Sequence, residues 1–432
     1  MSALAVVEGS RGHRTCRIVG WASFVLLAVL VPFWAVRTPS LSIGESSFTF
    51  SLGNLSHAVA YMVGVLGLGL LIGFNGQISL GNSFFMGIGA YLTATLVVDD
   101  GWPYLLTLVV VLPVTFIVGM LVGLPALRIR GLHLALTTLA LAAMFPAIVR
   151  LDTLRDQTGG ANGRRIDSDL DAPSWLRLED VAEVLAGIPL IGEWIFGEGR
   201  LGGRDAGAVW VYLLLAVLAA IAFWTTRNLI DSRPGRSIIA IRDNETGAAV
   251  SGVNLSMTKT LTFGVSAALG GLAGTMYAMA IQFVAPDVFG LNLAIFLVVG
   301  LVVGGVGTLS GAVIGGLVII FVPLWASQVV SVPGVPERFL RGPTGSFFLG
   351  LLLILLTFSL PGGVIDGART LRSRLVRVEP AGTASSPRGS TTATTVMPSA
   401  ARRHAGSAVT TRGTNQTRAT NRTRATDERE RT

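Results

Sequence analysis

The segment between residues 226 and 259 holds the residue types that can attach one protein to another. Pro234 and Gly235 interrupt the chain, and the stretch 236–241 is predicted to start a short helix, followed by charged residues beside small ones. A short helix with a small-residue face can insert into a groove on a partner, and neighbouring charges fix its register. An ordinary solvated loop is the alternative. The residues that we assign to docking are Arg236, Arg242, Asn244, Glu245, Ala248, Ala249, Gly252 and Asn254.

A second group of polar residues, Asn75, Gln77, Ser79 and Asn82, separates two apolar runs. If the neighbouring helices are broken, backbone groups are exposed to a polar path and these side chains become candidate path or gate residues. They can equally cap a turn at the cytoplasmic face. Both interpretations remain open from the sequence.

The chain lacks the residues of a nucleotide-binding loop and almost all of the buried carboxylates that an ion-coupled carrier needs. A nucleotide-binding loop needs a glycine-rich stretch followed by a lysine. The chain has a single lysine, Lys259, and no glycine-rich loop precedes it. We therefore expect no enzyme activity, no bound cofactor and no metal site, with ATP and magnesium used by a partner. Ion-coupled carriers commonly place carboxylates or histidines at membrane depth. The apolar runs carry almost no carboxylate, and His57 and His133 stand near predicted helix ends, where packing or an interfacial position is expected.

The composition is that of an integral membrane protein. Of the 432 residues 51% are hydrophobic and only 13% are charged, and the chain contains 53 glycines. The mean hydropathy is +0.64. The net charge of +8 arises largely from the arginine-rich end of the chain, with no basic stripe interleaved with aromatic residues, so nucleic-acid binding is not expected.

The apolar runs predict an all-α membrane protein, a helical bundle of about ten transmembrane helices in contact with the lipid bilayer. About 20 apolar residues are needed to cross the hydrocarbon layer, and only helices or closed barrels satisfy the backbone there. The Gly-rich region 290–316 is the weakest part of this prediction and is compatible with broken or re-entrant helices. The predicted spans are 18–36, 53–73, 80–98, 104–126, 132–149, 209–225, 260–282, 290–307, 310–330 and 346–363.

Short loops rich in arginine mark the cytoplasmic side of a membrane protein. With ten spans the basic segments fall on one side together with both termini, and residues 150–208, where acids outnumber arginines, fall on the other. We expect a bacterial plasma-membrane protein. The predicted regions are a basic cytoplasmic N-terminus (1–17), five helices (18–149), an external loop (150–208), five helices that include the coupling loop 226–259 (209–363), and a basic disordered cytoplasmic tail (364–432).

Several segments resemble the permeases of bacterial ATP-binding-cassette importers for branched-chain amino acids. Of the two permease subunits in such importers, the chain resembles the M-type subunit. The resemblance extends in order over residues 53–363. Three departures are Ala249, where the family often has an acidic residue, a segment 150–208 that is longer than expected, and an arginine- and threonine-rich tail without a family counterpart. The segments that carry the resemblance are Gly73–Asn82 with Phe85–Tyr91, Pro125–His133, Thr158–Gly163, Arg242–Asn254 and Val303–Gly311.

The resemblance implies a complex of two homologous permease subunits, two cytoplasmic ATPases and an external solute-binding protein. It implies that residues 242–254 form the loop that couples the permease to an ATPase. The alternatives from the sequence are a permease of this kind for urea, short amides or another small polar solute, an ion-coupled secondary transporter, and a membrane scaffold that transports nothing.

Glycines crowd the predicted span 53–73, and a second group recurs at spacings of three or four residues through the predicted spans 290–307 and 310–330. Helices approach closely where side chains are absent, so such stripes mark helix contacts in lipid. We expect close helix packing, with broken helices as the alternative. The first group comprises Gly64, Gly67, Gly69 and Gly73, and the second comprises Gly300, Gly304, Gly307, Gly311 and Gly315.

Overall fold

The computed structural model describes residues 4–7, 40–43, 46–49, 51–126, 132–166, 203–328, 350, 363–365 and 376–379. The chain divides into two compact units, Met1–Ala381 and Gly382–Thr432, and every element below belongs to the first. The predicted span 18–36, nearly all of 346–363 and the tail beyond 379 lie outside the described residues, as does the stretch 167–202 of the predicted external loop.

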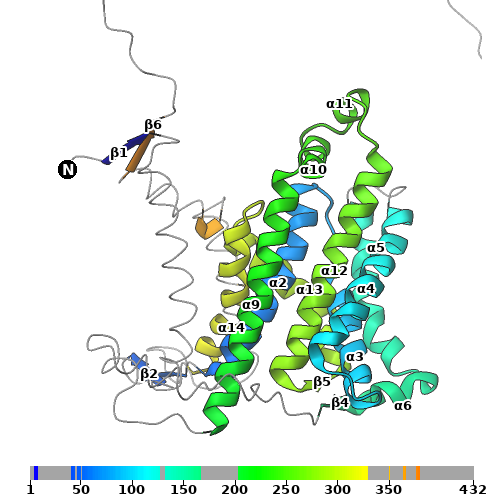
Figure 1. Ribbon diagram of the computed structural model, residues 1–432, viewed down its shortest axis with the longest axis vertical. Coiled ribbons are helices and arrows are strands. Elements are labelled where there is room, and N and C mark those ends of the chain that lie inside the picture. The colour runs from blue at the N-terminus through cyan, green and yellow to red at the C-terminus, as the bar shows by residue number, and fades with distance from the viewer. Residues whose placement is uncertain are drawn as a thin grey trace, which may run out of the picture. The chain divides into compact units, whose positions relative to one another are not determined.

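Helices dominate the described residues (Figure 1). The longer ones are α2 (Leu52–Gly69), α3 (Asn82–Val98), α4 (Tyr104–Ala126), α5 (Leu132–Val149), α9 (Gly203–Asp231), α10 (Arg233–Asp243), α12 (Leu255–Ile281), α13 (Leu291–Gly304) and α14 (Leu309–Gln328). The shorter ones are the π-helical turn η1 (Leu70–Phe74) that continues α2, η2 (Asp152–Leu154), α6 (Arg155–Thr158), η3 (Gly160–Asn162), α11 (Glu245–Val250) and η4 (Pro286–Phe289).

The number of helices that can cross a membrane is smaller among the described residues than the ten predicted. Four are long and apolar enough, Leu52–Phe74, Tyr104–Pro125, Gly207–Asp231 and Leu255–Ile281. A fifth arises if α5 and the following short helices, bent by 67°, count as one span. The protein is an all-α membrane protein, and the ten crossings are not reproduced. The shorter apolar helices are Asn82–Val98, Leu291–Gly304 and Leu309–Leu324.

One of the predicted spans, 290–307, needs correction at its end, because helix α13 has 14 residues and ends at Gly304. Helix α14 begins at Leu309, within one residue of the predicted start of the span 310–330. Gly305 and Gly307 adopt positive φ angles of 118° and 78°, which side-chain-bearing residues rarely adopt. The apolar run is therefore broken by its own glycines. Helix α3 likewise begins at Asn82, because residues 76–81 form a non-helical loop.

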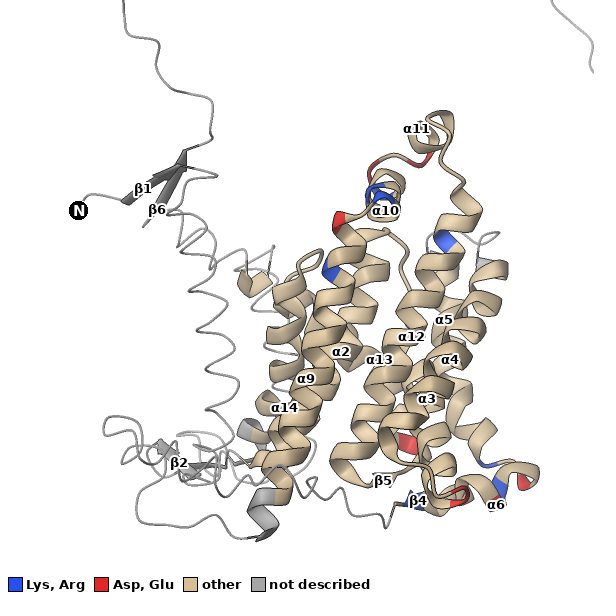
Figure 2. Cartoon of the chain, viewed as in Figure 1, with Lys and Arg blue, Asp and Glu red and all other residues tan. Residues whose placement is uncertain are grey.

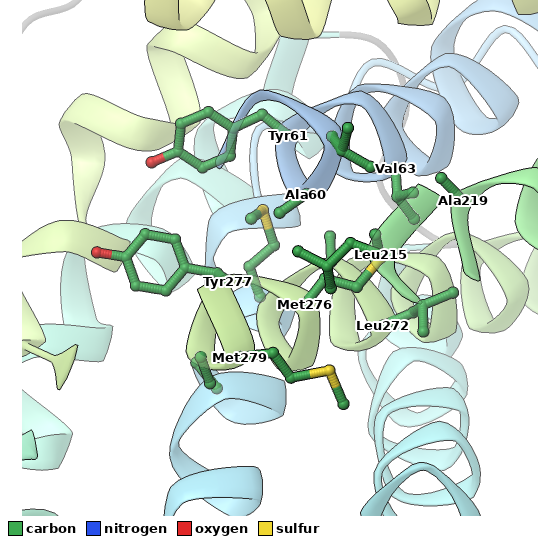
Figure 3. Close-up of a cluster of buried hydrophobic side chains, with 14 of the residues drawn as sticks. Ala60, Tyr61, Val63, Leu215, Ala219, Leu272, Met276, Tyr277 and Met279 are labelled. Carbon is green, nitrogen blue, oxygen red and sulfur yellow. The ribbon is translucent and has the colours of Figure 1, made fainter. Parts of the chain in front are cut away.

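Helix α12 lies at the centre of the bundle and contacts α2, α3 and α4, while α14 packs on α2 and α13. Glycines permit this packing: a Cβ at Gly274 would lie 1.9 Å from the Met86 carbonyl oxygen, and one at Gly89 would lie 2.1 Å from that of Gly271. Apolar side chains fill the contacts between α2, α9 and α12, among them Val63, Leu215 and Leu272 (Figure 3).

Hydroxyl and amide groups join the same helices within the apolar interior. The Ser266 hydroxyl donates to the Gly67 carbonyl at 2.7 Å, and the hydroxyls of Thr93 and Thr275 share a hydrogen bond of 2.8 Å. The Asn82 side-chain amide donates to the Gly64 carbonyl at 2.7 Å. Hydrogen bonds between membrane helices contribute roughly 0.6–2 kcal/mol each, so these contacts supplement close packing.

Short strands complete the structure. Strand β4 (Arg164–Arg165) pairs antiparallel with β5 (Phe283–Val284), which ties the segment after α5 to the end of α12. The Arg150 side chain reinforces this connection with an ion pair of 2.6 Å to Asp287, and Arg164 pairs with Asp99. The other pairs are β1 (Leu4–Val7) with β6 (Val376–Glu379), parallel, and β2 (Ser40–Ile43) with β3 (Ser46–Thr49), antiparallel.

Charged side chains of the helical bundle gather at its two ends (Figure 2). One end carries α10, α11 and the adjoining ends of α9 and α12, and the other carries α6 and β4. The helices between them are almost free of charge, as expected for segments that cross the hydrocarbon layer. The first end holds Arg227, Arg233, Arg236, Arg242 and Lys259 against Asp231, Asp243 and Glu245.

Candidate functional site

Helices α10 and α11 form the candidate site, a helical hairpin at one end of the bundle between α9 and α12 (Figure 1). Helix α10 begins where the Ser232 hydroxyl accepts a hydrogen bond from the Gly235 amide, with Pro234 in the first turn. A Cβ at Gly235 would lie 2.1 Å from the Ile230 carbonyl oxygen, so α10 folds tightly back over the end of α9. The buried Ile238 and Ile241 fix its inner face.

Three of the predicted docking residues define where the helices begin and end. The Asn244 side chain accepts from the Gly247 amide at 2.9 Å and starts α11, and Asn254 accepts from the Met257 amide at 3.0 Å and starts α12. Gly252 has a φ of 87° and ends α11 in a left-handed turn. These residues therefore set the shape of the hairpin, whatever else binds it.

Arg242 joins the hairpin to the bundle. Its guanidinium donates a hydrogen bond of 2.9 Å to the Gly73 carbonyl in η1, and the neighbouring Asp243 carboxylate holds the same group at 3.0 and 3.1 Å. The π-helical turn, with its Asn75 amide bonded to the Leu70 carbonyl, ends α2 at this place. A helix end leaves carbonyl groups without partners inside the helix, so the Gly73 oxygen is available to Arg242.

The contact between Arg242 and Gly73 lies next to a second break in the bundle, the turn between α13 and α14. A Cβ at Gly73 would lie 2.5 Å from the Gly307 amide nitrogen, so the two backbones touch. Gly307 lies in the turn between α13 and α14, and a Cβ there would be 3.8 Å from the Arg242 guanidinium. Arg242, the end of α2 and the α13–α14 turn therefore meet at one point.

Glu245 and Lys259 connect α11 to α12. The Lys259 ammonium lies 2.8 Å from a Glu245 carboxylate oxygen, and the two side chains are 14% and 35% exposed. Ala248, in the same helix α11, is buried. The pair fixes how α11 stands on the start of α12, and partial burial makes it stronger than an exposed ion pair.

The outer face of the hairpin is open to a partner. Arg236, Ala249 and Gly252 are exposed, and no atom lies within 4 Å of a Cβ built at Gly252. Val250 is 86% exposed, the highest value among the exposed large apolar side chains of the described residues. A single exposed apolar side chain is common on protein surfaces, so the case for a contact rests on the open face that Val250 shares with the small residues Ala249 and Gly252.

The four candidate path residues are buried; Asn75, Gln77 and Ser79 lie in the loop between η1 and α3, and Asn82 is the first residue of α3. Asn75, Gln77, Ser79 and Asn82 are 2–8% exposed. The Asn75 amide donates to Gln77 at 2.9 Å, and the Leu80 amide donates to the Thr138 hydroxyl at 2.9 Å. The loop lies directly behind Arg242, because a Cβ at Gly76 would be 3.0 Å from that side chain.

The glycines singled out in the sequence occupy two kinds of position. A Cβ at Gly300 would lie 3.0 Å from the Gly315 carbonyl oxygen, and one at Gly304 would lie 1.9 Å from that of Gly311. Gly300, Gly304 and Gly311 thus lie at the contact between α13 and α14. Gly307 is different, since its positive φ makes the turn.

Sequence reasoning missed Val250, the pairing of Lys259 with Glu245, and the contact of Arg242 with Gly73. The exposed Val250 follows two small residues, Ala248 and Ala249, that the sequence assigns to docking. The partners of Arg242 and Lys259 are set by the fold. Among the described residues no group of three or more His, Cys, Asp or Glu side chains is placed to hold a metal ion.

The chain matches the family described as branched-chain amino acid transport system / permease component over residues 51–357. The chain belongs to this family. The match confirms the resemblance drawn from the sequence motifs. The family is one of transport permeases, so the chain is an integral membrane permease.

Individual relatives carry the same description. A high-affinity branched-chain amino acid transport system permease protein, LivM of Salmonella typhimurium, is 28% identical over 281 residues, 63% of each chain. LivM of Escherichia coli K12 is 27% identical over 322 residues, 73% of this chain and 69% of the relative. LivH of the same organism is 27% identical over 132 residues, 30% of this chain and 41% of the relative.

The match therefore spans less than two thirds of the length of the Salmonella relative. No solved structure matches the chain.

Proposed function

We propose that this chain is the M-type permease subunit of an ATP-binding-cassette importer and forms the translocation path for branched-chain amino acids. Two cytoplasmic ATPases supply the energy, and they use the ATP and magnesium, while this chain binds no cofactor. The names of the relatives support the cargo. The hairpin of α10 and α11 supports coupling to an ATPase. One face of it is exposed, and Arg242 connects it to the helical bundle.

The observation that carries the proposal is the hydrogen bond from Arg242 to the Gly73 carbonyl. When ATP draws the two ATPases together, a hairpin seated on one of them moves with it. The Arg242 guanidinium then pulls on the end of α2, and the contact of Gly73 with Gly307 passes the displacement to the turn between α13 and α14. Both connections act at breaks in helices, where a small change of backbone angles tilts a whole helix.

The complex that we propose contains a second homologous permease subunit, two ATPases and an external solute-binding protein that selects the cargo. We place it in the bacterial plasma membrane with both termini in the cytoplasm. The end of the bundle that carries α10 and α11 holds more basic than acidic residues, which favours the cytoplasmic side. The opposite end, with α6 and β4, then faces the binding protein.

The proposal is tested with the transporter purified in mild detergent together with whatever subunits accompany the chain. We expect an ATPase and a second permease in the preparation. In proteoliposomes the complex should take up labelled leucine when ATP is present, and urea should not compete. Uptake driven by an ion gradient without ATP, or uptake of urea in place of leucine, would overturn the proposal.

A further inference from the structure

Residues 150–166, which we call the strap, follow α5 at the end of the bundle opposite α10 and α11 (Figure 1). The strap contains η2, α6, η3 and β4, each of two to four residues. Arg150 pairs with Asp287 in η4 at 2.6 Å, and β4 pairs with β5 at the end of α12. Arg164 pairs with Asp99 at the end of α3. One short segment therefore connects α5 to the ends of α12, η4 and α3.

The connections made by the strap are weaker than the contacts within the bundle. Arg150 and Asp287 are 42% and 74% exposed, and exposed ion pairs contribute little to stability. Strands β4 and β5 have two residues each, extended by the Ile166 amide, which donates to the Gln282 carbonyl at 2.9 Å. Among the described residues Gln282 is the one residue other than glycine with a positive φ, of 54°. A side-chain-bearing residue is strained there, and segments with few buried contacts open first.

Next to the strap, α5 meets α3 and η4 through aromatic rings. The Phe145 ring centroid lies 5.9 Å from that of Tyr91 in α3 and 6.0 Å from that of Phe289 in η4, and all three side chains are buried. The Phe145 ring covers Gly87 of α3, where a Cβ would lie 2.3 Å from it. The Tyr91 hydroxyl donates to the Val284 carbonyl in β5 at 3.4 Å. The rings therefore adjoin the strand with which the strap pairs.

This contact of α5 differs from the packing of α3 on α12. Helices α3 and α12 touch backbone to backbone at Gly89 and Gly274, and such close packing favours movement as one unit. Helix α5 instead meets α3 by side chains, which can change rotamer and separate. Helix α5 is therefore the element that can move against the pair of α3 and α12 once the strap releases it.

We propose that the strap, together with Tyr91, Phe145 and Phe289, forms the outer gate of the translocation path, closed in this structure. The substrate enters when the strap releases α5 and the Phe145 ring leaves Gly87. Helix α12 begins at the hairpin and ends at β5, so a single helix extends from the proposed ATPase contact to the strap. This inference rests on the proposed function, which places this end of the bundle outside the cell.

A disulfide across the strand pair tests the gate. In a chain whose Cys16 is replaced by serine, Arg165→Cys and Phe283→Cys lie at opposed, exposed positions of β4 and β5. Opposed residues of antiparallel strands have Cα atoms about 4.5–5.5 Å apart, a separation that a disulfide can bridge. In the reconstituted complex, oxidation should abolish ATP-dependent uptake of labelled leucine, and reduction should restore it.

A second pair joins α5 to η4 directly and leaves the strands unaltered. Arg150→Cys and Asp287→Cys, bridged by a short bifunctional thiol reagent, should also lose uptake. Asp152→Cys and Asp156→Cys are the matched control, because both positions are exposed and lie within the strap, so the same reagent ties the strap to no other element. Full uptake in either gate pair after complete cross-linking would overturn the inference, as would an equal loss in the control.

A readout that does not depend on the cargo separates the gate from the proposed function. Phe145→Cys, in the chain without Cys16, should react with an impermeant thiol reagent added outside while the complex hydrolyses ATP, and not at rest. Met86→Cys is the control, since Met86 is fully buried in α3 away from these rings, and it should stay unlabelled. Labelling of Phe145→Cys that is equal with and without ATP would overturn the gate, whereas leucine uptake by the wild type decides the proposed function.

Discussion

The Arg242 guanidinium lies 2.9 Å from the carbonyl oxygen of Gly73, a residue 169 positions earlier in the chain. This hydrogen bond links the predicted docking segment to the break at the end of α2. Our account of how transport is driven rests on it. Hydrogen bonds that involve a charged group contribute about 1.5–3 kcal/mol. The bond between Arg242 and Gly73 can therefore transmit a displacement of the hairpin to α2 without breaking.

Replacing Arg242 should uncouple transport from ATP hydrolysis. In Arg242→Ala the bond to Gly73 is lost, and we expect leucine uptake to fall by about tenfold or more, in line with the free energy of a charge-assisted hydrogen bond. The ATPase should still co-purify, because the exposed face of α11 is unchanged. Uptake and ATP hydrolysis are measured in the same proteoliposomes.

Arg227→Ala provides the matched control. Arg227 is also exposed at this end of the bundle, and it pairs only loosely, at 3.8 Å, with Asp231 one turn away. Exposed pairs of this kind contribute about 0.3–0.5 kcal/mol, so uptake should stay near the wild-type rate. Equal uptake in the two variants would remove Arg242 from the path of transmission.

A side chain at Gly73 should disturb the meeting of α2 with the α13–α14 turn. In Gly73→Ala the new methyl group would lie 2.5 Å from the Gly307 amide nitrogen, and backbone cannot yield as a flexible side chain does. Overpacking of this kind costs about 1–3 kcal/mol. We expect a lower unfolding temperature of the purified protein and slower uptake.

Gly207→Ala is the control, because no atom lies within 4 Å of a Cβ at that position in α9. Alanine favours a helix over glycine by up to about 1 kcal/mol, so this variant should be at least as stable as the wild type. If Gly73→Ala unfolds at the same temperature as Gly207→Ala, the two backbones do not touch.

A bulky residue at Gly252 should block the docking of the ATPase. Gly252→Trp places an indole on the open face of the hairpin, and we expect uptake to be abolished and the ATPase to be lost from the purified complex. Gly101→Trp is the matched control at the opposite end of the bundle, since Gly101 also has a positive φ, of 66°, and open space around it. The control variant has the same kind of backbone strain and should retain the ATPase. Normal ATP-dependent uptake in Gly252→Trp would refute docking at this face.

Reversing the charge of Glu245 should abolish uptake, because Glu245→Arg sets two cations side by side at the base of α11. If the pair acts by orienting α11, the second change Lys259→Glu should restore part of the uptake. Loss of one partner of a half-buried pair costs on the order of 2 kcal/mol, or more than tenfold in rate. Failure of the double variant to recover would contradict the orienting role of this pair.

The sequence allowed the long membrane helices to be predicted because their apolar runs are continuous. Helices α2, α4, α5 and α12 begin and end within a few residues of the expected positions. The breaks were harder, since glycine both packs helices and interrupts them. Only the backbone angles at Gly305 and Gly307 distinguish a turn from a continuous span.

The contacts of the candidate site could not be predicted for a different reason. Local signals such as Asn244 and Asn254 fix helix starts through neighbours three residues away. The partner of Arg242 lies in another helix, and so do the rings that face Phe145. Such pairs depend on how the helices pack, which no spacing within one segment reveals.

The side of the membrane reached by α11 tests the central claim most directly. In a chain whose Cys16 is replaced by serine, Val250→Cys is exposed on the hairpin and Gly101→Cys marks the opposite end. A thiol reagent that cannot cross the membrane is added to intact cells and to inside-out vesicles. The account predicts labelling of Val250→Cys in the vesicles only and of Gly101→Cys in the cells only, whereas labelling of Val250→Cys in intact cells would contradict it.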